Sequence, residues 1–82
     1  MEVRDFLNHL WYDADIIITE NGKADFIIDT IIRGFDVEEV KEDTLFIGKN
    51  SEMRSELYKH LLHKDIRCFG TINDCIIIEL YD

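Results

Sequence analysis

The chain has 82 residues, 46% of them hydrophobic, which is enough for one domain with a thin core and excludes a disordered chain. Nine lysines and arginines stand against 18 aspartates and glutamates, giving a formal net charge of -9. A surface of this charge repels phosphates, so direct binding to DNA, to RNA or to an anionic membrane is not expected.

The first third of the chain predicts a helix followed by a hairpin. Apolar residues at positions 3, 6, 7 and 10 have the spacing of one helix face, and Trp11 and Tyr12 are expected to pack in the core after it. Residues 15–20 predict a strand. Asn21-Gly22 then predicts a type I′ turn, and residues 23–32 predict the return strand.

This predicted first hairpin would be apolar on both of its faces. Ile17, Phe26 and Ile28 fall on one face, while Ile16 and Ile27 fall on the other. A sheet with two apolar faces must be covered twice. Because the chain is short, we expect the second cover to come from another copy, which makes the protein a homodimer.

The remaining elements complete an α+β domain. A short helix is predicted at 37–41, a brief strand at 44–47, and a long amphipathic helix from Ser51 to Lys64. The chain then predicts a second hairpin, 66–72 and 75–81, whose β-branched return strand should be central and buried. The result is one domain over residues 1–82, an antiparallel sheet of two hairpins with two to three helices, in the order α-β-β-α-β-α-β-β.

The cellular setting follows from the chain start and the cysteines. Met1–Asp5 lacks the basic and apolar regions of a signal peptide, and no apolar run is long enough to cross a membrane. Cys68 and Cys75 do not form a disulfide framework, and free thiols are expected in a reducing compartment. These features predict a cytoplasmic protein.

One cluster of residue types has the chemistry of a metal site. His60 and His63 are three residues apart on the predicted long helix, and zinc takes four nitrogen or sulfur ligands. In the predicted second hairpin, however, Cys68 and Cys75 would lie more than about 10 Å apart, so both cannot easily join the histidines. We therefore predict no metal, no cofactor and no catalytic residues, with a zinc enzyme around these histidines as the least favoured alternative.

The beginning and end of the chain resemble a class of small proteins. The segments 3–7, 15–18 with Asn21-Gly22, and 71–78 look like short acidic phage and prophage accessory proteins of Firmicutes, among them an anti-CRISPR protein of similar style. This resemblance covers about residues 1–30 and 66–82, and its motifs are structural. It implies an accessory, anti-defence protein that acts by binding and is not an enzyme.

Charge and resemblance together favour an acidic inhibitor of a basic host or effector protein. Acidic side chains would cover a basic groove that normally holds nucleic acid. The candidate partner-binding residues are the carboxylates of two segments: Asp25, Asp29, Glu38, Glu39, Glu42 and Asp43.

A small-molecule binder is the alternative from a different class. A protein that sequesters a signalling nucleotide would need several cations around the phosphates. Arg33 and Arg67 are the best placed of the available cations, which also include Lys49, Arg54 and Lys59.

Overall fold

Two isoleucine-rich strands, β1 (Asp15–Glu20) and β4 (Cys75–Leu80), run parallel at the centre of a four-stranded sheet. The edge strands β2 (Phe46–Lys49) and β3 (Ile66–Ile72) pair with them antiparallel, in the order β2-β1-β4-β3. This computed structural model describes residues 1–81. The α+β class is confirmed, but the sheet is mixed and not purely antiparallel.

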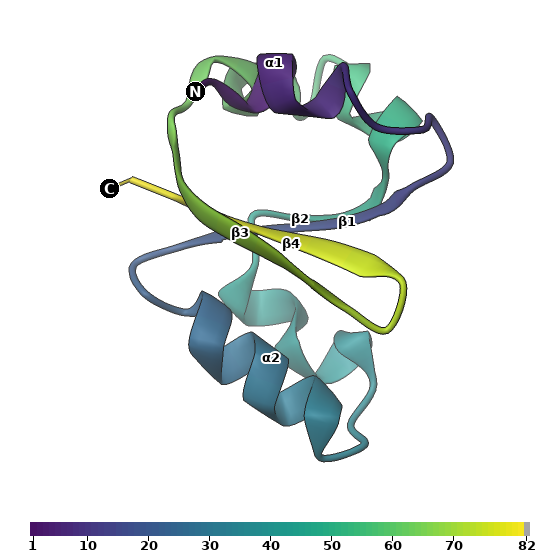
Figure 1. Ribbon diagram of the computed structural model, residues 1–82, viewed down its shortest axis with the longest axis vertical. Helices are drawn as coiled ribbons and strands as arrows, with labels where there is room; N and C mark the ends of the chain where they lie inside the picture. The colour runs from purple at the N-terminus through teal and green to yellow at the C-terminus, as the bar shows by residue number, and fades with distance from the viewer. Residues whose placement is uncertain (82) are drawn as a thin grey trace.

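Helical segments cover both faces of the sheet (Figure 1). On one face, α1 (Val3–Leu7) and the 3₁₀ helices η2 (Asn50–Arg54) and η3 (Lys59–His63) enclose a core around Ile16, Ile18 and Ile78. On the other face, α2 (Ala24–Ile32) and the 3₁₀ helix η1 (Val37–Asp43) enclose a second core around Ile17 and Ile77. Successive strand residues point to opposite faces, so consecutive isoleucines serve both cores.

The predicted return strand at 23–32 is wrong, because this segment forms helix α2. Asn21 and Gly22 do take positive φ angles of 62° and 76°, but the turn leads into a helix and not back along β1. Apolar residues at 24, 27, 28 and 31 have helical spacing, and all four pack in the second core. Helix α2 of the same chain therefore supplies the second cover. The argument for a homodimer from a hairpin with two apolar faces does not hold.

The predicted long helix from Ser51 to Lys64 is also wrong. The segment forms η2 and η3, separated by residues 55–58, and the backbone of Ser55 is extended with φ −69° and ψ 157°. The break lets Met53 of η2 and Leu61 and Leu62 of η3 reach the same core from different directions.

The expected core position of Trp11 and Tyr12 is wrong as well. Helix α1 ends at Leu7, and both aromatic side chains lie exposed in the loop before β1, with Trp11 82% exposed. The buried side chain of Asn50 holds this loop, because its amide donates to the carbonyls of Leu7 and Trp11 at 3.1 and 3.0 Å.

The second hairpin is confirmed, with β3 and β4 joined at Asn73 and Asp74. Both turn residues have positive φ, 47° and 64°, as a type I′ turn requires. Strand β4 is central and largely buried, as its β-branched sequence predicted. Across residues 1–81, none of the helices has the length and apolar character needed to cross a bilayer.

Candidate functional site

The six predicted partner-binding carboxylates lie together in one helical layer. Asp25 and Asp29 belong to α2, and the other four belong to η1, which packs beside α2 below the sheet in Figure 1. Five of the six are exposed, and Asp43 is half-buried. We call this set the acidic face: Asp25, Asp29, Glu38, Glu39, Glu42 and Asp43.

Most of the acidic face is not neutralised within the chain. Asp29 pairs with Arg33 at 3.1 Å, and Asp43 pairs with Lys23 at 3.5 Å. The other four carboxylates make no ion pair with any of residues 1–81. The segment 23–43 that forms this layer contains seven acidic and three basic residues. It therefore presents a negative potential to solvent.

The opposite helical layer is more balanced. Its two segments, 1–13 and 50–65, contain six acidic residues against four lysines and arginines, and they also hold all three histidines. The negative charge is thus distributed unevenly over the two faces of the sheet.

Large apolar side chains lie exposed among these carboxylates. Phe26 is 54% exposed, and Ile32 and Phe35 are also exposed. On a helical wheel, Asp25, Phe26, Asp29 and Ile32 share one arc of α2, opposite the buried residues. The strand prediction for 23–32 missed this arc. The helical spacing of the buried residues in the same segment was the signal that could have identified it.

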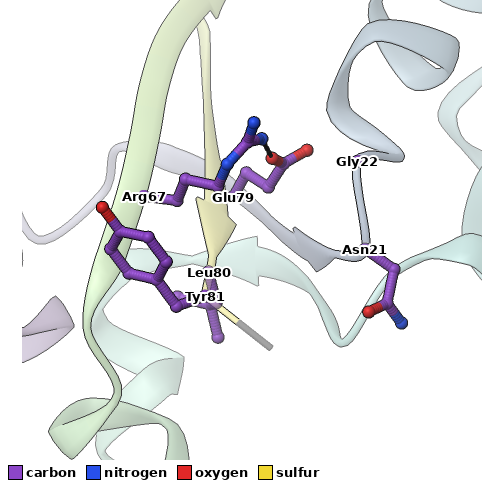
Figure 2. Close-up of a pocket in the computed structure, with 6 residues that line it drawn as sticks. All are labelled: Asn21, Gly22, Arg67, Glu79, Leu80 and Tyr81. Atoms are coloured by element: carbon purple, nitrogen blue, oxygen red, sulfur yellow. Dashed lines mark hydrogen bonds and ion pairs between the residues drawn. The ribbon is translucent and has the colours of Figure 1, made fainter.

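The second feature of interest is an ion pair between a buried carboxylate and an exposed guanidinium, beside a surface cavity (Figure 2). Glu79 of β4 is only 2% exposed, and its carboxylate binds the guanidinium of Arg67 on β3. A β-bulge between Ile66 and Cys68 interrupts the register where Arg67 reaches across to Glu79. The cavity measures about 480 Å³, and its walls also include Asn21, Gly22, Leu80 and Tyr81.

Both carboxylate oxygens of Glu79 are already engaged. Oε1 accepts a hydrogen bond from the backbone N–H of Ala24 at 3.1 Å, and Oε2 binds Arg67. The hydrogen bond and the charge of Glu79 raise the pKa of Arg67 above its ordinary value. We therefore assign the pair a structural role: it joins the start of α2 to the sheet. A charged residue inside the apolar run 75–80 was the signal that sequence reasoning passed over.

The five cations proposed for nucleotide binding are each bonded to a different part of the chain. Arg33 pairs with Asp29, Arg54 bonds to the side chains of Asn50 and Asn8, and Arg67 binds Glu79. The two lysines pair with neighbouring carboxylates: Lys49 with Asp15 at 2.8 Å and Lys59 with Glu56 at 3.6 Å. The hydrogen bond to Asp15 raises the pKa of Lys49. Each of these cations is thus already engaged within the chain.

The histidines and cysteines do not assemble a metal site among residues 1–81, where no three metal-ligand side chains come together. His60 and His63 lie in η3. The two cysteines lie at different ends of the β3–β4 ladder, Cys68 opposite Glu79 and Cys75 opposite Ile72. Burial, followed by the charge of Asp15, raises the pKa of the Cys75 thiol.

Comparisons with protein-family models, with curated proteins and with solved structures return no match for this chain.

Proposed function

We propose that this chain is a binding protein that inhibits a basic, nucleic-acid-binding protein by covering its groove with the acidic face. The observation that carries the proposal is the gathering of carboxylates from α2 and η1 on one layer. Four of them lack an ion pair within residues 1–81. Unpaired carboxylates on a folded surface offer a basic groove the same sign of charge as nucleic-acid phosphates.

The exposed apolar residues supply the second requirement of such an interface. Stable protein interfaces have an apolar, often aromatic, centre inside a polar rim. Phe26, Ile32 and Phe35 lie in the same layer as the carboxylates, and their exposure leaves apolar area to bury on binding. In this proposal the charges steer the encounter, and the apolar side chains slow dissociation.

The biological setting that we propose follows from this chemistry and from the resemblance at the chain ends. A small acidic inhibitor of a nucleic-acid-binding effector suits an anti-defence role for a phage or prophage protein in the bacterial cytoplasm. No catalytic residue is required for such a role.

The test compares two matched triple variants as baits in bacterial lysate. Glu38→Lys, Glu39→Lys and Glu42→Lys reverse three charges of the acidic face. The control reverses three exposed acids of the opposite layer: Asp5, Asp13 and Glu56. Both variants have the same net charge.

We expect the wild type and the control to retain one stoichiometric basic partner that is released at high salt, and the acidic-face variant to lose it. Equal retention by both variants, or a partner that high salt does not release, would contradict the proposal.

A further inference from the structure

The outer side of β3 is an open sheet edge. The type I′ turn at Asn73 and Asp74 makes Ile72 and Cys75 a hydrogen-bonded pair. Hydrogen-bonded and non-hydrogen-bonded pairs alternate along an antiparallel ladder. The backbone N–H and C=O groups of Phe69 and Thr71 therefore point away from β4. Within residues 1–81, no strand pairs with this outer side between 68 and 72.

The N-terminal residues show which way the edge faces. On the other side of the bulge, the backbone groups of Ile66 also point away from β4. The N–H of Ile66 donates to the carbonyl of Met1 at 2.8 Å. Glu2 and Asp65 add one antiparallel bridge there. Met1 and Glu2 thus pair with the β3 edge at 65–66, and no other segment of residues 1–81 pairs with this edge from Phe69 onward.

The open part of this edge lacks the features that normally prevent strand addition. Edge strands are usually protected by charge, proline, a bulge or short length. At the other edge, β2 is four residues long and ends at Lys49. The open part of β3, residues 68–72, is five residues long and begins after the bulge, and the single charged side chain of β3, Arg67, is bound to Glu79. Phe69 is 61% exposed and packs against Phe6, with ring centroids 4.6 Å apart and the ring planes tilted by 47°.

We propose that a second copy of this chain covers the edge, with two β3 strands paired antiparallel about a two-fold axis at Gly70. In this register Phe69 of each copy lies opposite Thr71 of the other. The outward N–H and C=O groups of these residues would form four backbone hydrogen bonds. The two sheets would join into one of eight strands. A Cβ added at Gly70 would meet nothing within 4 Å, so the chain itself leaves room for a side chain at the axis position.

The charge of the chain favours a second copy as the partner that pairs with this edge. Two chains of net charge -9 repel over most of their surfaces, whereas residues 66–72 contain no acidic residue. Pairing at Gly70 also brings the turn of one copy, with its exposed Asp74, near the Arg67–Glu79 ion pair of the other. A basic partner finds no carboxylate along this strand and is attracted instead to the acidic face. The dimer is therefore independent of the proposed inhibition.

Cysteine trapping tests the register directly. In a background with Cys68→Ser and Cys75→Ser, the Gly70→Cys thiols of two copies would face each other across the axis, with Cα atoms about 4.5 Å apart, close enough for a disulfide. Thr71→Cys is the matched control. Its two Cα atoms would be about 8 Å apart, too far for a disulfide. We expect a covalent dimer on a non-reducing gel from Gly70→Cys alone. No dimer, or equal dimer from both variants, would overturn the register.

Sedimentation equilibrium of the protein without any partner tests whether the β3 edge mediates dimerisation. We expect the wild type to dimerise, and Phe69→Lys to weaken the dimer by about tenfold or more, since it places a cation on each strand near the axis. Phe26→Lys makes the same substitution at a similarly exposed residue of α2 and should leave the dimer unchanged. Circular dichroism would check that both variants are folded. A monomeric wild type, or equal loss with both variants, would overturn the proposal.

Discussion

Glu79 Oε1 accepts a hydrogen bond from the backbone N–H of Ala24, at 3.1 Å and across 55 residues of sequence. The contact places a carboxylate at the first residue of α2, where the helix has unpaired N–H groups and a partial positive charge. It links the helix that carries part of the acidic face to the central strand of the sheet.

Removing this carboxylate should destabilise the fold. Glu79→Ala leaves the Ala24 N–H without its acceptor, which we expect to cost about 1–3 kcal/mol in the free energy of unfolding. Glu79→Gln keeps an amide oxygen for Ala24 and loses only the charge that binds Arg67, so its loss should be smaller. Urea denaturation of the two variants measures both costs. A larger loss for Glu79→Gln than for Glu79→Ala would show that the link to α2 is unimportant.

The loop that carries Trp11 should depend on Asn50. This fully buried side chain donates to the carbonyls of Leu7 and Trp11, and Asn50→Ala would leave both without this donor. We expect a loss of about 2 kcal/mol in stability.

Trp11 is the single tryptophan, so its fluorescence anisotropy reports on this loop. The anisotropy should fall in the Asn50→Ala variant. Ser51→Ala, an exposed neighbour whose backbone N–H holds the Tyr12 carbonyl, serves as a control because the backbone bond is retained. Unchanged anisotropy in Asn50→Ala would rule out this anchoring role.

The two thiols should differ in reactivity. Burial raises the pKa of Cys75 above its ordinary value, so at neutral pH less of it is the reactive thiolate, and half-burial also limits access. Cys68 is exposed and should be alkylated first. Because the pKa of Cys75 is raised, its rate should continue to increase at alkaline pH, above the range of an ordinary thiol. Mass spectrometry of Cys68→Ser and Cys75→Ser measures each rate. Equal rates at neutral pH would contradict the environment assigned to Cys75.

The elements predicted correctly were those with a local signal. Asn73-Asp74 between two apolar runs defined the second hairpin, and the β-branched run at 76–78 correctly indicated a central strand. Asn21-Gly22 gave the same kind of signal, but a turn of positive φ does not decide whether a strand or a helix follows it. Here the i, i+3, i+4, i+7 spacing of the apolar residues 24, 27, 28 and 31 was the better guide.

The interactions that sequence reasoning missed depend on residues far apart in the chain. Asn50 donates a hydrogen bond to Trp11, 39 residues away in the sequence, and Glu79 accepts one from Ala24, 55 residues away. No local pattern reports such contacts. The sequence shows that the chain is rich in acidic residues, but the gathering of six of them on one layer follows from the packing of α2 against η1.

The most direct measurement of the central claim is displacement of nucleic acid from the captured partner. A fluorescent duplex is bound to the partner, and the chain is titrated in at constant salt. The proposed inhibition predicts stoichiometric release by the wild type and by the control variant at Asp5, Asp13 and Glu56, and no release by the Glu38, Glu39 and Glu42 variant. If the duplex stays bound while the wild type binds the same partner, the acidic face does not occupy a nucleic-acid groove.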